Sequence, residues 1–173
     1  TKCDHICLTM YHEDGKPYAK CICEAGQKLD PNDATKCISA QSDRFLIYSN
    51  AKLGEMKAIS LDEVDPIEVM APITGLERPI AIDYHAKQEF IYYSDTSQMR
   101  IGRIKVDGTQ RNDDFITTGV SNCEGIAIDW IGDNIFWTDE RMKSISVAKI
   151  SDPLKRKTLI RDDLSHPRAI VVD

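Results

Sequence analysis

A carboxylate ends the segment IFWTD, whose last residue is Asp139. Large apolar side chains precede it, as they do in a buried strand. A carboxylate at the end of such a strand suits general acid–base catalysis or metal binding. The segment recurs, however, as IYYSD ending at Asp95 and as LIYSN ending at Asn50. A catalytic acid has no reason to recur, so we predict that these side chains accept hydrogen bonds from backbone N–H groups at strand-end turns.

The three copies are spaced by 45 and then 44 residues. Two further landmarks recur with nearly the same spacing. The first lies 12 positions after the last residue of each copy, at Asp62, Asp107 and Ser151. The second follows it at Asp83, Asp129 and Asp173. Several short strands repeated at about 40–50 residues are typical of a β-propeller blade. We therefore predict an all-β region over residues 43–173, in which Tyr93 and Trp137 pack between stacked sheets.

The first 38 residues differ from the rest in composition. They hold five of the six cysteines, at positions Cys3, Cys7, Cys21, Cys23 and Cys37. So short and polar a stretch needs covalent or metal staples to fold. A zinc site is the alternative, but zinc sites usually pair C-x-x-C motifs, and the spacings here are C-x3-C and C-x-C. The pattern favours disulfides and therefore an oxidising compartment.

The cysteine order resembles an epidermal-growth-factor-like module that lacks its first cysteine. The family pairing would then give Cys3–Cys21 and Cys23–Cys37, with Cys7 bonded to a cysteine outside this chain. Behind that module, the run CEGIAIDWIGDNIFWTDE at residues 123–140 and the segment YYSD resemble the YWTD propellers of the low-density-lipoprotein receptor family, especially its large receptor-related endocytic members. The resemblance divides the chain into a module at 1–38 and a propeller part at 43–173.

That resemblance implies a six-bladed propeller. Residues 43–173 make about three blades at the observed spacing, so we expect them to be the first half of a propeller within a longer chain. The parent would be a single-span receptor, anchored outside this segment, at the extracellular face of the plasma membrane and in endosomes. The segment would be non-catalytic and would support ligand uptake and acid-dependent release. Its partners would be protein ligands or neighbouring ligand-binding modules of the same receptor.

Two other functions stay open. The first is an adhesion or signalling propeller that binds a protein directly, as in nidogens or Wnt co-receptors. The second is a calcium-dependent hydrolase, for which Asp83, Asp129 and Asp173 would be ligands, although one structural carboxylate per blade explains them better. No cofactor is expected in this segment, calcium is expected in neighbouring modules, and no metal ligand is assigned. The net charge of −6 argues against nucleic acid as a partner.

Four remaining features carry weaker expectations. His85 and His166 are predicted in loops, where an imidazole can sense the acidity of endosomes. The basic cluster at residues 155–157 either meets an acidic partner or is a solvated turn. Cys123 is either a buried thiol or one half of a disulfide to a cysteine elsewhere in the parent.

Overall fold

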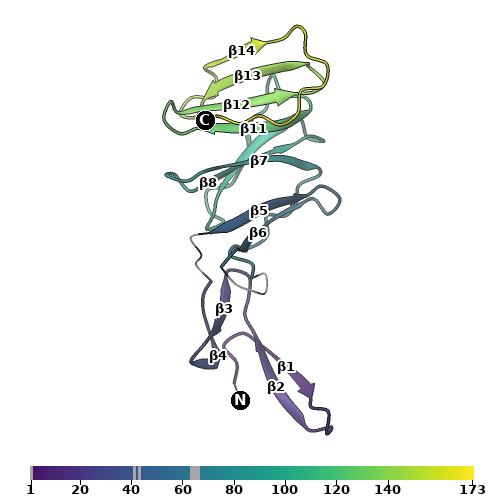
Figure 1. Cartoon of the computed structure of the whole chain (residues 1–173), viewed down its shortest axis with the longest axis vertical. Coiled ribbons are helices and arrows are strands. Elements are labelled where there is room, and N and C mark those ends of the chain that lie inside the picture. Colours follow the sequence, from purple (N-terminus) through teal and green to yellow (C-terminus); the bar gives the residue numbers. More distant parts are fainter. Residues whose placement is uncertain (1, 41, 43, 63–66) are drawn as a thin grey trace. The chain divides into compact units, whose positions relative to one another are not determined.

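The computed structural model describes residues 2–40, 42, 44–62 and 67–173. In these residues all regular structure is β, which confirms the predicted class (Figure 1). The short strands are β1 (Ile6–Tyr11), β2 (Pro17–Ile22), β3 (Gln27–Asp30), β4 (Asp33–Ser39), β5 (Phe45–Asn50) and β6 (Glu55–Ser60). Within the described ranges no helix is long and apolar enough to cross a membrane.

The chain forms two compact units. The first comprises residues 1–47 and 57–72, and the second comprises residues 48–56 and 73–173. The predicted division into 1–38 and 43–173 follows the sequence resemblance and stays a prediction.

The first unit is built from hairpins and two disulfides. Strand β1 pairs with β2, and β3 pairs with β4, all antiparallel. The disulfides join Cys3 to Cys21 and Cys23 to Cys37, the same pairs that the family pattern implies. Nearly every side chain of β1 and β2 is exposed, so these hairpins depend on the covalent links for their stability. The Cys7 thiol is exposed and unbonded.

The second unit contains two four-stranded antiparallel sheets. The first sheet has the order β10-β9-β8-β7, with β7 (Pro79–His85), β8 (Phe90–Asp95), β9 (Arg100–Lys105) and β10 (Asn112–Ile116). The second has the order β11-β12-β13-β14, with β11 (Cys123–Asp129), β12 (Asn134–Asp139), β13 (Ser144–Lys149) and β14 (Arg156–Ile160). We call these sheets blade 2 and blade 3. Strands β5 and β6 form a further two-stranded sheet, which we call blade 1.

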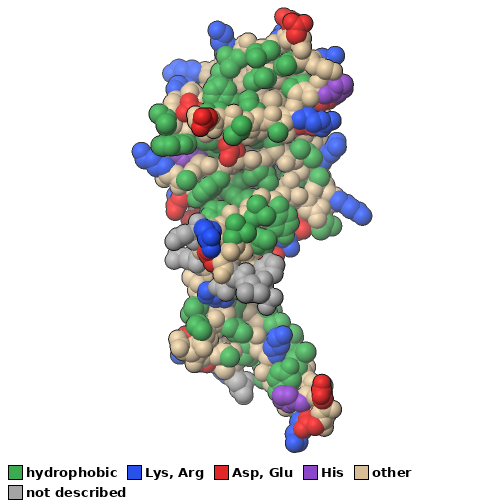
Figure 2. Space-filling model, in the orientation of Figure 1, with side chains coloured by type: hydrophobic (Ala, Val, Ile, Leu, Met, Phe, Trp, Pro, Cys, Tyr) green, Lys and Arg blue, Asp and Glu red, His purple; other side chains and the backbone are tan. Residues whose placement is uncertain are grey.

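The core lies between blades 2 and 3, where their side chains form one buried cluster. Tyr92 and Ile101 contribute from blade 2, and Ile126, Ile135 and Trp137 contribute from blade 3. Burial of large apolar side chains between neighbouring sheets is what a propeller repeat requires, because no blade can cover its own faces. Edge strand β14 is exposed throughout. On the face of the molecule drawn in Figure 2, hydrophobic side chains are interspersed with charged ones.

Candidate functional site

Asp95 and Asp139 hold the loops at one end of their blades. Both side chains are fully buried. The Asp95 carboxylate accepts hydrogen bonds from the backbone N–H groups of Glu77 at 2.9 Å and Arg78 at 3.0 Å. Such an anion surrounded by backbone donors fixes the local path of the chain. This is the kind of contact that the sequence repeat leads one to expect.

Asp139 repeats the arrangement one blade later. Its carboxylate accepts from the backbone N–H groups of Ser121 at 2.5 Å, Asn122 at 3.1 Å and Met142 at 2.8 Å. In blade 1 the amide oxygen of Asn50 accepts, among the described residues, from Lys52 and Leu53 in its own turn, each at 3.2 Å. Asn50 therefore keeps one part of the role, namely the cap on its own turn.

The hydroxyl residue before each signature residue links successive blades, a role that sequence reasoning missed. The Ser49 hydroxyl donates to the carbonyl of Ile80 at 3.3 Å, and the Ser94 hydroxyl donates to the carbonyl of Cys123 at 2.8 Å. The Thr138 hydroxyl donates in the same way to the carbonyl of Arg168. The recurrence of Ser or Thr before Asp or Asn was the available signal.

The strand register corrects the third landmark. Across the β7–β8 hairpin Asp83 pairs with Tyr92, and His85 pairs with Phe90. Across β11–β12 it is Asp129 that pairs with Asn134. Since the two hairpin turns have the same length, His85 and not Asp83 occupies the position of Asp129. The shared letters IAID are displaced by two residues between the blades, so the predicted recurrence of Asp83 and Asp129 at one position is wrong.

The two aspartates accordingly make different contacts. Asp83 accepts a hydrogen bond from the N–H group of Ile128 at 2.7 Å and so joins blade 2 to blade 3. Asp129 accepts from Gly132 N–H at 2.8 Å and from the Asn134 amide at 2.8 Å, within its own turn. Those hydrogen bonds hold the pKa of Asp129 below its usual value. Among the described residues no cluster of three potential metal ligands forms, and these carboxylates do not converge.

Cys123 is a buried thiol in the second unit. It occupies the same position as Pro79, because each pairs with the signature aspartate of its blade. Its side chain is fully buried, and its sulfur donates to the carbonyl of Gly125 at 3.5 Å. Burial raises the pKa of the thiol, so Cys123 packs as a small apolar residue and is not an activated nucleophile.

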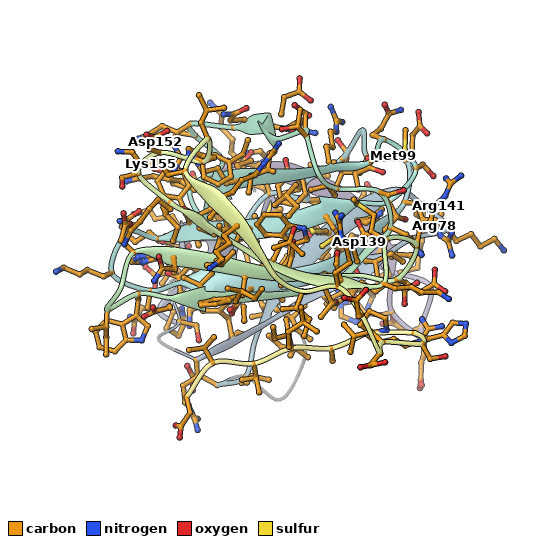
Figure 3. The ribbon with its side chains drawn as sticks, turned by 90° about the horizontal axis from the view of Figure 1, so that it is seen from above. Arg78, Met99, Asp139, Arg141, Asp152 and Lys155 are labelled. Atoms are coloured by element: carbon orange, nitrogen blue, oxygen red, sulfur yellow. A yellow bond between two sulfur atoms is a disulfide. The ribbon has the colours of Figure 1, made fainter. Side chains whose placement is uncertain are left out.

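A groove opens where the aspartate-held loops of blades 2 and 3 meet. It has a volume of about 440 Å³ and is lined by Arg78, Thr96, Ser97, Met99, Ser121, Asn122, Glu140 and Arg141. Figure 3 shows Arg78, Met99 and Arg141 at one edge of the second unit, with Asp139 inward of them and with Asp152 and Lys155 at the opposite edge. We call this feature the blade 2–3 groove.

The polar groups of the groove divide into paired and unpaired sets. The Asn122 amide donates to Glu124 at 3.1 Å and to Glu140 at 3.2 Å, so both carboxylates already have a hydrogen-bond donor within the loop. Glu124 also pairs with Arg168. In contrast, no ion pair to a described residue forms at Arg78 or Arg141, although both line the groove. Two unpaired guanidinium groups beside the half-exposed Met99 suit a protein segment that presents carboxylate or amide oxygens.

The two histidines predicted as acid sensors lie in different environments. His166 is exposed, and its Nε2 lies 3.7 Å from Glu140 Oε1 at the groove. His85 was expected in a loop, and this expectation is wrong. It ends strand β7, is only 2% exposed, and accepts a hydrogen bond from Gln88 N–H on its Nδ1 at 3.2 Å. Strand β7 continues for two residues beyond the IAID segment, which ends at Asp83, and so it includes His85.

The buried Tyr93 belongs to a partly exposed hydrogen-bond network in blade 2. Its hydroxyl donates to Asp113 Oδ1 at 2.5 Å, and Arg111 Nε donates to the same oxygen at 2.7 Å. Burial alone would raise the pKa of Asp113, but the hydrogen bonds from Arg111 and Tyr93 outweigh it and lower the pKa. Arg111 also donates to the carbonyl of Thr74, so the network anchors the loop before blade 2.

Comparison with known proteins now gives the family. Residues 133–173 match the family described as low-density lipoprotein receptor repeat class B. The low-density lipoprotein receptor-related protein 5 of Mus musculus is 31% identical over 133 residues, which are 77% of this chain and 8% of that protein. Residues 133–173 therefore resemble a low-density lipoprotein receptor class B repeat. In this structure the repeat comprises β12 to β14 and the residues that follow, with Asp139 as its signature carboxylate.

Solved structures agree with the propeller fold. A chain in the crystal structure of a nidogen/laminin complex aligns with a TM-score of 0.66 and 27% identity, over 75% of this chain and 49% of that chain. Virginiamycin B lyase from Staphylococcus aureus aligns with a TM-score of 0.58 over 95% of this chain and 52% of that chain, but at 17% identity it shows the fold alone. The chain thus spans about half the length of these solved chains.

Proposed function

We propose that this chain is an extracellular, non-catalytic, protein-binding segment of a receptor related to the low-density lipoprotein receptor, and that the blade 2–3 groove contacts its ligand. The observation that carries the proposal is that Arg78 and Arg141, beside Met99 on loops held by buried carboxylates, make no ion pair with any described residue. Rigid loops lose little entropy on binding, and Arg is enriched at the centres of protein interfaces.

The ligand would be a protein segment with exposed Asp, Glu or Asn side chains. It would come from a separate protein or from a neighbouring module of the same receptor. The opposite edge of the unit offers a contrast, because Lys155 there is already paired with Asp152 at 3.3 Å. A cation that is already paired gains less from a new carboxylate than one that is unpaired.

The test is a selection from a phage-displayed random peptide library on the purified chain. We expect selected peptides to be rich in acidic and amide residues and to bind the Arg141→Glu variant at least about tenfold more weakly. Lys155→Glu makes the same change of charge at the far edge and should leave binding within about twofold. Equal weakening by both variants, or by neither, would refute the assignment of the groove.

We also place acid-dependent release, the finer part of the receptor function, at His166. Protonation of this exposed imidazole would create an ion pair with Glu140, which is itself bonded to Asn122 in the groove. The new ion pair would draw Glu140 away from Asn122 and loosen the groove loop, and we propose that this loosening outweighs the added positive charge, which alone would favour an acidic peptide. A selected peptide should then dissociate faster at pH 5.5 than at pH 7.4, and His166→Ala should remove the difference. His12, an exposed histidine in the first unit, supplies the control variant His12→Ala, which should retain it.

An adhesion function is the second candidate. The observation favouring it is the likeness to a chain in the nidogen/laminin complex at 27% identity. Purified laminin is the probe, measured by surface plasmon resonance at pH 7.4. Saturable binding that Arg141→Glu abolishes would favour adhesion through the same groove, while absence of binding would leave the receptor function as the better account.

A further inference from the structure

A second polar pocket lies at blade 3 and shares no lining residue with the blade 2–3 groove. It has a volume of about 230 Å³, and its lining includes Trp137, Ser146, Arg156, Lys157, Thr158 and Arg161. Three of these residues are cations, and no acidic residue is found among the described residues that line the pocket. The named residues come from strand β12, its neighbour β13 and the edge strand β14, except Arg161, which directly follows β14.

Trp137 brings an unpartnered donor to this pocket. Its side chain is 1% exposed, and its buried indole Nε1 has no hydrogen-bond partner among the residues that the structure describes. A buried N–H group without an acceptor costs about 1–3 kcal/mol, and native proteins keep few of them. An acceptor that enters the pocket would remove that cost.

Blade 2 shows what kind of acceptor fits. Trp137 corresponds to Tyr93, because each faces the matching residue of the third strand, Ser146 and Gly102 respectively. The hydroxyl of Tyr93 donates to the carboxylate of Asp113. In blade 2 the aromatic donor is thus satisfied by an anionic oxygen.

The position of Asp113 is taken by Thr158 in blade 3. Asn112 pairs with Arg103 as Lys157 pairs with Val147, which places the following residues, Asp113 and Thr158, at one position. The preceding arginines agree with this register. Arg111 Nη1 donates to the Thr74 carbonyl at 2.8 Å, and Arg156 Nη1 donates to the Thr118 carbonyl. Blade 3 therefore keeps the donors of the network and replaces its carboxylate with a hydroxyl.

The remaining donors are also in place. Arg111 uses Nε and Nη2 to bind the two oxygens of Asp113, at 2.7 and 3.0 Å. The same two atoms of Arg156 make no hydrogen bond to any residue that the structure describes, while its Nη1 is held by Thr118. The Ser146 hydroxyl lies 3.2 Å from that of Thr158, and Lys157 and Arg161 add positive charge. A guanidinium edge with two N–H groups matches the two oxygens of an oxyanion.

We propose that this pocket binds an oxyanion group, a carboxylate or a sulfate, which occupies the position that Asp113 holds in blade 2. The bound oxygen accepts from Trp137 Nε1 and from the Arg156 edge, and Lys157 and Arg161 neutralise its charge. This inference does not depend on the blade 2–3 groove, which uses other residues.

The chain holds two tryptophans, and this makes the test specific. Trp130 is 62% exposed on the turn between β11 and β12 and serves as an internal control for Trp137. The purified chain, labelled with ¹⁵N, is titrated with sodium sulfate and separately with sodium acetate in Tris chloride at constant ionic strength. The indole N–H signals of both tryptophans are followed by NMR.

We expect the Trp137 signal to shift with a saturable curve, while the Trp130 signal stays nearly fixed. Lys157→Ala should weaken the apparent affinity about tenfold, the effect of losing one charge-assisted contact. Lys155→Ala removes the same charge from a residue that precedes Arg156 in the chain but does not line the pocket, and it should leave the affinity unchanged. Saturation by sulfate alone points to a tetrahedral oxyanion as ligand, and saturation by acetate points to an acidic side chain.

Thr158→Asp provides a second variant that does not depend on ligand affinity. It should supply the carboxylate from within, move the Trp137 indole signal without added salt and abolish the response to sulfate or acetate. The proposal is overturned if both indoles shift linearly and together, which would mean an adventitious ion only. It is equally overturned if Trp137 stays fixed at high anion concentration, or if Lys155→Ala and Lys157→Ala weaken binding alike.

Discussion

Replacement of Asp139 by alanine should destabilise the second unit by about 2–4 kcal/mol. The change leaves three backbone N–H groups without their acceptor, at Ser121, Asn122 and Met142. Ser121 and Asn122 are half-buried, and each unsatisfied donor there costs about 1–2 kcal/mol. Met142 lies at the surface, where water replaces the lost acceptor at small cost. Asp139→Asn keeps one acceptor oxygen, so we expect about half of that loss.

Urea unfolding followed by tryptophan fluorescence measures this loss. Trp130 and Trp137 are the only tryptophans of the chain, and both lie in the second unit, so the signal reports that unit alone. Asp152→Ala removes a half-buried carboxylate whose one ion pair among the described residues is with the exposed Lys155, and it should change stability by about 0.5 kcal/mol or less. A loss below about 1 kcal/mol for Asp139→Ala, or one equal to that of Asp152→Ala, would refute the structural role assigned to the repeated carboxylate.

Three further predictions use other parts of the molecule. Ser94→Ala should cost about 1–2 kcal/mol in the same urea assay, because the buried hydroxyl donates to the Cys123 carbonyl and accepts from Ala81 N–H; no change would exclude it as a link between blades. The pKa of Asp113 is lower in the folded protein than the value of about 3.9 expected in the unfolded chain. The ionised carboxylate therefore stabilises the fold above about pH 3.9, and this stabilisation is lost as the pH falls through the lower folded pKa. Asp113→Asn should consequently flatten the fall in Tm between pH 5 and pH 2. An unchanged slope would count against that assignment. A thiol reagent should modify Cys7 rapidly and Cys123 only after unfolding, given their opposite exposure, and fast modification of both would contradict the buried site.

The repeat made much of the fold predictable from the sequence. IYYSD and IFWTD are strands whose apolar residues and terminal aspartate are set by local pattern, and both end at the expected residue in the structure. The disulfide-stapled character of the first unit followed from cysteine density in the same local way. These features need no knowledge of how strands pair.

Features that depend on pairing register were harder to predict. The letters IAID occur in β7 and β11 at positions two residues apart in register, so Asp83 was matched with Asp129 and His85 was assigned to a loop. The blade 2–3 groove brings together loops that are more than 40 residues apart, at Arg78 and Asn122. The correspondence of Thr158 with Asp113 likewise depends on a bulge that shifts the pairing of the outer strand.

Hydrogen exchange tests the central claim, that the aspartate-held loops of blades 2 and 3 form the ligand surface. The chain is compared by mass spectrometry with and without a saturating peptide selected from the library at pH 7.4. The account predicts added protection in residues 76–79, 96–99 and 119–124, with none at residues 152–157 on the opposite edge. Protection confined to the opposite edge or to the first unit, with the groove loops unchanged, would contradict it.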